Sequence, residues 1–207
     1  MAYVRWSELE IDPARLVGFM MLTDENVREV RKEPGVIAFY TAAEKGHPNH
    51  IRVLEIYIDE SAYQAHLQIA NFRKIRASTS QMVLNRRLFE AAPVELGAKP
   101  GLPPTDTVVR IAELEIDPTQ LDAYKATVIM EIDTAVRVEP GVFAIYAVAL
   151  KDQPNQLRFF EIYADERAYL LHRESLHFRK YLDTTQSMIT ARILIDATPG
   201  FPSSQSR

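Results

Sequence analysis

The sequence contains no cysteine among its 207 residues. This absence excludes disulfides, thiolate zinc sites, iron–sulfur clusters and a cysteine nucleophile. The sequence also lacks any run of about 18 apolar residues, so no membrane-spanning helix is predicted. Its N-terminal segment has no apolar stretch of the kind found in signal peptides. We therefore expect a cytoplasmic protein with no membrane partner.

An excess of basic charge is also lacking. The net charge is −4, which gives no general field to attract nucleic acid, so no nucleic-acid partner is expected. The seven glycines are scattered and form no phosphate-binding loop, and no Gly-x-Ser-x-Gly elbow is present. With 47% hydrophobic and 25% charged residues, the composition is that of an ordinary globular protein.

The sequence does contain an internal repeat. Glu-Leu-Glu-Ile-Asp-Pro begins at Glu8 and again at Glu113, an offset of 105 residues, and Glu-Pro-Gly-Val begins at Glu33 and Glu139, an offset of 106. A period of about 100 residues is the length of a whole domain. We therefore predict a first domain at 1–94, a Gly- and Pro-containing linker at 95–106, a second domain at 107–198 and a flexible tail at 199–207.

Each half is predicted to have the element order β-α-β-β-α-β. Asp12-Pro13 is typical of a helix start and Pro34-Gly35 of a helix end. This order is the ferredoxin-like arrangement of the α+β class, with one antiparallel sheet per domain. The strands at 36–43 and 51–58 are apolar on both faces, so each sheet needs a second cover. We expect the two sheets to pack face to face as an intrachain pseudo-dimer; whether two chains pair again stays open.

The middle of each half carries a family resemblance. In the first half the pattern is Glu55-x-Tyr57, Asp59-Glu60, Ala62, His66 and Phe72, and in the second it is Glu161-x-Tyr163, Asp165-Glu166, Ala168, His172 and Phe178. This pattern resembles the antibiotic biosynthesis monooxygenase domain of the dimeric α+β barrel superfamily. Members are usually single domains that form homodimers, so the resemblance implies a tandem version within one chain.

The family includes cofactor-free oxygenases of quinols and polycyclic phenols, haem-degrading enzymes and isomerases. The haem degraders carry a haem-ligating His about ten residues after a pocket Trp. Here His66 and His172 stand at the Trp-like position, and Arg76 and Leu182 stand ten residues further on. The resemblance therefore implies an oxygenase without haem, and we expect no cofactor.

His66 and His172 are the candidate catalytic residues, because they alone among five His occupy matching positions. A His can remove a proton near neutral pH, and a deprotonated phenol or quinol can pass an electron to O₂. The equally weighted alternative is a structural His that is hydrogen-bonded at a helix end.

Eight further residues form the candidate substrate-binding set, because they match in pairs between the halves: Tyr40 and Tyr146, Glu55 and Glu161, Tyr57 and Tyr163, Arg86 and Arg192. The tyrosines could stack on an aromatic ring, although core packing is the commoner role. The two Glu residues stand in apolar strands, where a carboxylate must be paired or protonated. They either orient the His residues or, in the interpretation that we favour, form ion pairs with the two Arg residues.

The His47-x-x-His50 spacing could suggest a metal site, but the second half has Gln153 and Gln156 at the matching positions, and the intervening Pro-Asn is a turn signal. No metal site is predicted. The favoured function is a cofactor-independent monooxygenase that oxidises an electron-rich aromatic, such as a quinol or polyphenol, with O₂. The alternatives are a non-catalytic small-molecule-binding or structural protein, and an oxygen-independent isomerase.

Overall fold

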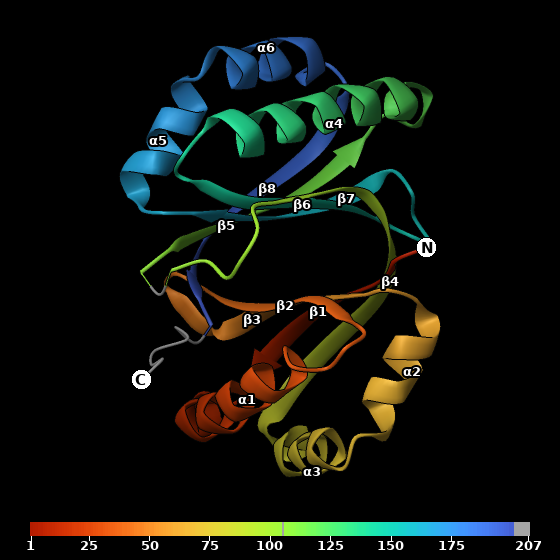
Figure 1. Cartoon of the computed structure of the whole chain (residues 1–207), viewed down its shortest axis with the longest axis vertical. Helices are drawn as coiled ribbons and strands as arrows, with labels where there is room; N and C mark the ends of the chain where they lie inside the picture. Colours follow the sequence, from red (N-terminus) through yellow and green to blue (C-terminus); the bar gives the residue numbers. More distant parts are fainter. Residues whose placement is uncertain (105, 201–207) are drawn as a thin grey trace. The chain divides into compact units, whose positions relative to one another are not determined.

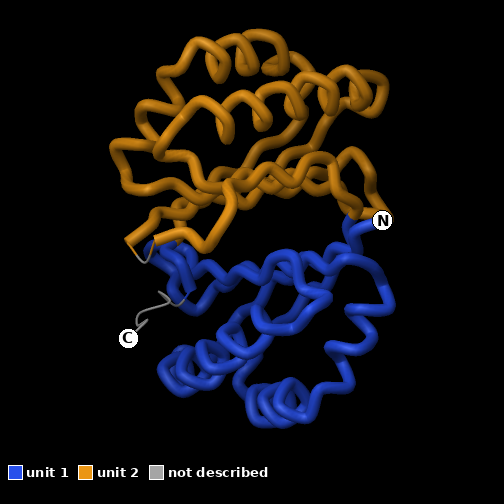
Figure 2. The backbone as a smooth tube through the Cα atoms, in the orientation of Figure 1, with its two compact units in different colours: residues 1–91, 198–207 blue, residues 92–197 orange. Residues whose placement is uncertain are grey.

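The computed structural model describes residues 1–104 and 106–200, which form two compact units (Figures 1 and 2). Unit 1 comprises residues 1–91 and the chain from residue 198, and unit 2 comprises residues 92–197. Each unit contains one copy of the internal repeat. The two copies therefore lie in two separate compact units.

The elements follow the same order in both units. Unit 1 contains β1 (Tyr3–Ile11), α1 (Leu16–Val30), β2 (Val36–Glu44), β3 (His47–Tyr57), α2 (Glu60–Gln68), α3 (Ala70–Thr79) and the start of β4 (Val83–Ala98). Unit 2 contains β5 (Val108–Ile116), α4 (Leu121–Val138), β6 (Val142–Leu150), β7 (Gln156–Tyr163), α5 (Glu166–Glu174), α6 (Leu176–Thr185) and most of β8 (Ile189–Pro199). The predicted α+β class and ferredoxin-like order are confirmed in both units.

Each unit has an antiparallel sheet with its helices on one face (Figure 1). In unit 1, β1 pairs with β3 and β4, and β3 also pairs with β2. In unit 2, β5 pairs with β7 and β8, and β7 also pairs with β6. The two central strands of each sheet therefore come from the first and third strands of each repeat.

Repeated Asp residues begin the helical segments. The Asp59 side chain accepts a hydrogen bond from the Ala62 amide at 2.8 Å, and Asp165 does the same for the Ala168 amide at 2.7 Å. Asp12 accepts from the amide of Ala14, at the turn that leads into α1. Such caps satisfy amides that have no partner inside a helix. These contacts explain why the Asp positions recur in both halves.

The core of each unit lies between its sheet and its helices. In α4 the buried side chains of Tyr124, Val128 and Ile132 belong to the same apolar cluster as strand residues of unit 2. Burying one such side chain contributes roughly 1.5–3 kcal/mol relative to leaving it in water. In α1 the matching side chains are Phe19 and Val27.

The last strand of each repeat begins in one unit and ends in the other. Residues 92–98 of β4 belong to unit 2, where the amide of Lys99 donates to the carbonyl of Phe143 at 2.8 Å. The end of β8 belongs to unit 1, where the Gly200 amide donates to the Thr41 carbonyl at 2.8 Å and the Thr41 hydroxyl donates to the Gly200 carbonyl at 2.6 Å. The strand order is β1-β3-β2-β8-β5-β7-β6-β4.

The ends of β4 and β8 differ from the domain boundaries predicted from the sequence. Residues 95–98, assigned to the linker, extend β4, because the strand continues into the Gly- and Pro-containing segment. Pro199 ends β8 and Gly200 is hydrogen-bonded, although both were assigned to the flexible tail. The rest of the predicted tail, 201–207, lies outside the described residues.

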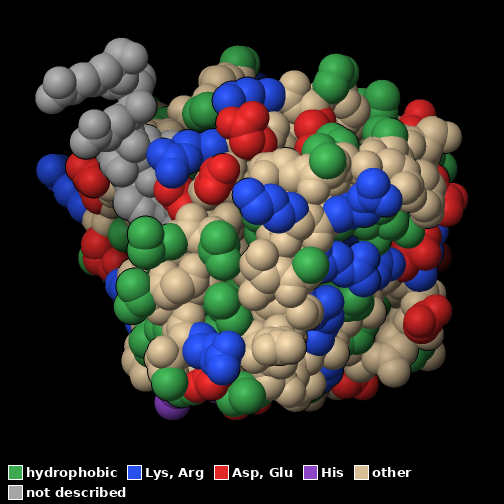
Figure 3. Space-filling model, turned by 90° about the horizontal axis from the view of Figure 1, so that it is seen from below, with side chains coloured by type: hydrophobic (Ala, Val, Ile, Leu, Met, Phe, Trp, Pro, Cys, Tyr) green, Lys and Arg blue, Asp and Glu red, His purple; other side chains and the backbone are tan. Residues whose placement is uncertain are grey.

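The outer face of α1 exposes Val17 and Met21 in its first half and charged side chains towards its end. It carries the ion pairs Arg28–Asp24 and Lys32–Glu29, each within one turn of helix. Figure 3, which views the chain from the side of α1 and α3, shows Lys and Arg beside Asp and Glu over this surface. Among the described residues, no helix combines the length and apolar character needed to cross a membrane.

Candidate functional site

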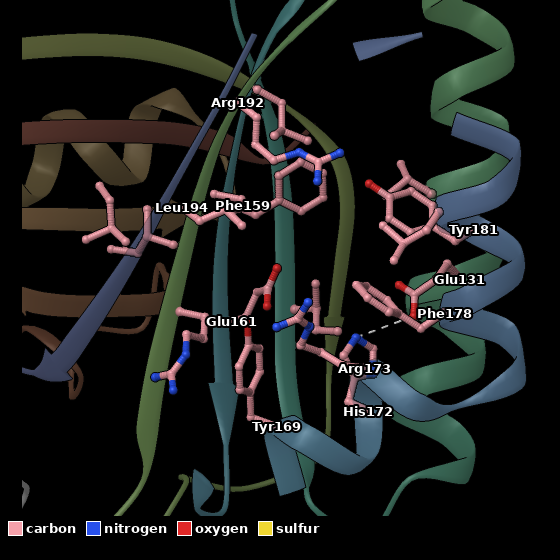
Figure 4. A pocket seen from close by; sticks show the side chains of 18 of the residues that line it. Glu131, Phe159, Glu161, Tyr169, His172, Arg173, Phe178, Tyr181, Arg192 and Leu194 are labelled. Carbon is pink, nitrogen blue, oxygen red and sulfur yellow. Dashed lines mark ion pairs between the residues drawn. The ribbon is translucent and has the colours of Figure 1, made fainter. Parts of the chain in front are cut away.

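Each unit contains a cavity between its sheet and its helices. The cavity of unit 2 has a volume of about 130 Å³ and that of unit 1 about 180 Å³. The walls in unit 2 are largely apolar and aromatic, with Val128, Phe159 and Phe178 among them. Figure 4 shows Phe178 and Tyr181 reaching the cavity from the helices, opposite Phe159 and Glu161 from the sheet. An apolar, aromatic lining with a few polar groups is typical of small-molecule pockets.

His172, a candidate catalytic residue, lies on the wall of the unit 2 cavity. It stands near the end of α5 and is 2% exposed. Its Nδ1 is hydrogen-bonded to Oε1 of Glu139 at 2.7 Å. Burial alone would lower the pKa of His172, but the hydrogen bond to Glu139 and the charges of Glu131 and Glu161 outweigh it, so that its pKa is raised.

His66 has the same helix position but a different setting. It is 1% exposed, and its Nδ1 lies 3.0 Å from Oε2 of Glu33. Its ring packs on Phe72 with 4.2 Å between ring centroids, and it is not among the residues that line the unit 1 cavity. The structure therefore places His66 as a packed, hydrogen-bonded His at a helix end.

Glu131 on α4 is a cavity residue that the sequence predictions do not include. It lines the cavity and is only 7% exposed. Its Oε1 is hydrogen-bonded to Nδ1 of His177 at 3.3 Å. Its Oε1 also lies 3.8 Å from Nε2 of His172, the ion pair marked in Figure 4. Burial raises the pKa of Glu131 to about 7, helped by the charges of Glu161 and Glu139 and opposed by that of His172.

A sequence signal for Glu131 exists. The residue interrupts the apolar series Tyr124, Val128, Ala135 at helical spacing, where a carboxylate is costly unless it has partners. The matching residue of unit 1 is Asn26, which is 7% exposed and lines the unit 1 cavity. The two cavities therefore differ in charge at the same position of the same helix.

Glu55 and Glu161 do not form the predicted ion pairs with Arg86 and Arg192 among the described residues. Instead the hydroxyl of Tyr57 donates to Oε2 of Glu55 at 2.8 Å, and in unit 2 the matching bond, from Tyr163 to Glu161, is 2.7 Å. The reason is local, because residues i and i+2 of a strand point to the same face. Burial raises the pKa of both carboxyls, while the Tyr hydrogen bonds and nearby positive charges oppose it.

Both Glu and both Arg residues of the predicted set line their cavities, whereas the four Tyr residues do not. Tyr57 and Tyr163 are fully buried beneath the Glu residues that they contact. Tyr40 and Tyr146 follow Phe39 and Ile145, which do line the cavities, so strand alternation turns these two Tyr to the other face. The sequence pattern did not show which face holds the cavity.

Arg110 and Tyr169 complete the polar edge of the unit 2 cavity and are also absent from the predicted set. Nη2 of Arg110 lies 2.6 Å from both carboxylate oxygens of Glu166, and its Nε lies 3.1 Å from Oδ1 of Asp196. Its guanidinium stands over the Tyr169 ring at 4.3 Å from the centroid. This pairing fixes Arg110 in one orientation. Arg192 lines the cavity near Phe159 (Figure 4).

His47 and His50 have the spacing that could suggest a metal site. Their rings stack at 5.4 Å between centroids, and Nδ1 of His50 lies 3.5 Å from Glu44. Within residues 1–104 and 106–200, no group of three or more His, Asp or Glu side chains is placed to hold a metal ion.

The comparison with protein families agrees with this architecture. The model of the family described as "Antibiotic biosynthesis monooxygenase" matches residues 3–78 and again residues 107–184. The chain belongs to this family. Its two matches make it a tandem member, with one family domain in each unit. The matches end before the C-terminal part of each repeat, so β4 and β8, with Arg86 and Arg192, lie outside them.

Solved structures show the same fold over nearly the whole chain. A candidate monooxygenase from Lactobacillus acidophilus NCFM is 17% identical, with a TM-score of 0.91 over 97% of this chain and 94% of that one. A candidate monooxygenase from Fusobacterium nucleatum is 19% identical, with a TM-score of 0.89 over 97% and 93% of the two chains. No curated protein matches the sequence significantly. At these identities the likeness establishes the fold of a tandem family member.

Proposed function

We propose that unit 2 of this antibiotic biosynthesis monooxygenase family member oxidises an electron-rich aromatic, such as a quinol or polyphenol, with O₂ and without a cofactor. The observation that carries the proposal is a buried acid–base pair, Glu131 and His172, on the wall of an apolar cavity. A group whose pKa is about 7 exchanges protons readily at neutral pH, which is what a general base for a phenol requires.

The remaining lining suits an aromatic ring that becomes negatively charged. Phe159 and Phe178 offer flat apolar surfaces for stacking. Arg192 supplies positive charge near Phe159, where it would stabilise a phenolate. Glu161 is held by the hydroxyl of Tyr163, which keeps this carboxyl in one orientation at the cavity wall. These residues bind and orient the substrate, while Glu131, with His172 3.8 Å away, takes its proton.

The proposed chemistry balances without a reductant. The base removes a phenolic proton, and the resulting anion passes one electron to O₂, which gives a substrate radical and superoxide. Their recombination forms a bond between a ring carbon and oxygen. Cleavage of the O–O bond then leaves one oxygen atom on the ring and releases the other as water. A quinol with a free ring C–H becomes a hydroxyquinone, and all the electrons that reduce O₂ come from the substrate.

The test is oxygen uptake by the purified chain in chelator-treated buffer across a panel of quinols and polyphenols. With an active substrate, ¹⁸O₂ should place one labelled atom in the product. Glu131→Gln and His172→Asn should each lower kcat by about 100-fold, the usual contribution of a general base. The matched variant His66→Asn in unit 1 should keep the wild-type rate, because His66 does not line a cavity.

Uptake that never exceeds autoxidation, or that is equal in Glu131→Gln and the wild type, would overturn the proposal. Turnover of a substrate under nitrogen would instead select an oxygen-independent isomerase that uses the same acid–base pair. For unit 1 we propose ligand binding without turnover. Asn26 stands where unit 2 has its carboxylate, and no His lines that cavity.

A further inference from the structure

Four side chains of unit 2 form a ring in which acid and base alternate. Oε1 of Glu131 lies 3.3 Å from Nδ1 of His177, and Nε2 of His177 lies 3.0 Å from Oε1 of Glu139. The same oxygen of Glu139 lies 2.7 Å from Nδ1 of His172, whose Nε2 lies 3.8 Å from Glu131. Each acid thus contacts both histidines, and each His contacts both acids.

The ring extends from the cavity toward the protein surface. Glu131 and His172 line the cavity, and their side chains are 6% and 2% exposed. His177 and Glu139 do not line it, and their side chains are 22% and 15% exposed. One side of the ring therefore faces the cavity, and the other side consists of the two more exposed side chains, His177 and Glu139.

We propose that this ring carries the substrate proton from the cavity to solvent, with His177 as the relay residue. The inference rests on the proposed function, because it describes how the base of unit 2 is reset after each turnover. Glu131 takes the phenolic proton and passes it to Nδ1 of His177. His177 then releases the proton on its buried Nε2 to Glu139, which lies 3.0 Å away, and the partly exposed Glu139 passes it to water. One proton leaves the cavity, and Glu131 is again a carboxylate.

The protonation states expected at neutral pH suit this transfer. Burial lowers the pKa of His177, against the charge of Glu139, so a neutral ring is ready to accept a proton. The groups that act on Glu131 are His172 from α5, Glu161 from β7 and Glu139 from the end of α4. A neutral imidazole can accept a proton on one nitrogen and release one from the other.

Unit 1 provides an internal comparison. It retains the pair His66–Glu33, which matches His172–Glu139 and joins the end of the second helix to the turn after the first. It has Asn26 and Asn71 where unit 2 has Glu131 and His177. The same fold therefore forms without the other two members of the ring. Glu131 and His177 occur together in unit 2 and are absent together from unit 1, as expected of two residues that act in the same proton transfer.

The test is the variant His177→Asn, which copies the residue at the matching position of unit 1. With an active quinol and a low buffer concentration, kcat should fall by about tenfold or more while KM stays within about twofold. Added imidazole should restore the rate, because a small base can replace the missing relay. The control Asn71→Ala, in unit 1, should keep the wild-type rate and show no response to imidazole.

Two results would overturn the relay and leave the proposed function standing. One is a His177→Asn variant as fast as the wild type at low buffer concentration. The other is a slow variant that imidazole does not restore, because a purely structural role predicts that result.

A second measurement tests the interaction of Glu131 with His177 without relying on turnover. In NMR titrations of the His ring signals, Glu131→Gln should lower the midpoint of His177, because a neighbouring negative charge is removed. An unchanged midpoint means that the two groups do not interact and overturns the ring. If the wild-type chain consumes no oxygen with any substrate, the proposed function fails and so does the role of the ring in turnover. A shifted midpoint would then still support the proton coupling of its members.

Discussion

At the scale of single residues, one position distinguishes the two cavities. Glu131 and Asn26 stand at the same point of matching helices, and both are 7% exposed. A carboxyl group in such a place holds its proton more strongly than it does in water, whereas an amide does not titrate. The carboxyl therefore gives unit 2 a titrating group, and with it a dependence of stability on pH that unit 1 lacks at this position.

We predict that Glu131→Gln changes how stability depends on pH. The pKa of Glu131 rises from 4.5 to about 7 on folding, so its contribution to stability is complete below pH 4.5 and is lost as the pH rises through about 7. Gln keeps the shape without this loss. Relative to the wild type, the free energy of unfolding of the variant should rise between pH 4 and 8 by up to about 3 kcal/mol.

Urea denaturation at several pH values measures this difference. Asn26→Gln is the matched control, because it introduces the same side chain in unit 1 and removes no titrating group. A difference between Glu131→Gln and the wild type that is constant across pH would contradict the raised pKa.

A second residue-scale prediction concerns the hydrogen bond between Tyr163 and Glu161. Tyr163→Phe should lower the free energy of unfolding by about 1–3 kcal/mol, because a buried carboxyl loses its donor. Tyr57→Phe should have a similar cost in unit 1. Chemical denaturation gives both values. A cost below about 0.5 kcal/mol in both units would mean that Glu161 and Glu55 find other partners.

At the scale of elements, the Glu-Pro-Gly-Val turn holds the first helix and the second helix together. The Glu of the turn reaches the His of the second helix, through Glu33–His66 and Glu139–His172. The Gly of the turn faces the Ala two residues into that helix: a Cβ on Gly141 would lie only 2.5 Å from the Cβ of Ala168. These contacts explain why Glu, Gly, Ala and His recur together in both halves.

We predict opposite effects for two Gly→Ala substitutions. Gly141→Ala should destabilise the chain by about 1–3 kcal/mol, because its methyl group has no room beside Ala168. Gly18→Ala should stabilise it by about 0.5–1 kcal/mol, because this position is inside a helix with nothing within 4 Å of the added carbon. Thermal unfolding compares the two variants. A stabilising Gly141→Ala would show that the turn and the second helix can move apart.

At the scale of the whole molecule, the last strand of each repeat begins in one unit and ends in the other, and unit 1 includes a segment distant in sequence. Unit 1 gains the segment from Thr198, and unit 2 begins inside β4 at Ala92. The hydrogen bonds between Thr41 and Gly200 join residues 159 apart in the chain. Such long-range pairing orders the ends of the last strands, which a local reading of Gly and Pro assigns to linker or tail.

We predict that a chain ending at Ala197 is less stable than one ending at Gly200. The shorter chain loses the two Thr41–Gly200 hydrogen bonds and the bond from the Thr198 hydroxyl to the Ala43 carbonyl. At about 1 kcal/mol for each bond, the cost should be about 2–3 kcal/mol. Hydrogen exchange should show the loss of protection in β2. Equal protection of β2 in both chains would mean that the segment from Thr198 does not stabilise unit 1.

By itself the sequence determined the duplication, the α+β order of each half, the helix starts and the family, because repeated apolar spacing, capping Asp and Gly-containing turns act locally. It also gave His172 as a catalytic candidate and Glu161 and Arg192 as substrate-binding candidates, and these roles stay predictions. Only the tertiary structure decided that His66 does not line the unit 1 cavity, that Tyr rather than Arg is hydrogen-bonded to the strand Glu, and that Glu131 lies beside His177. Those two residues are 46 apart and lie on different helices. Whether such side chains meet depends on how the helices pack on the sheet.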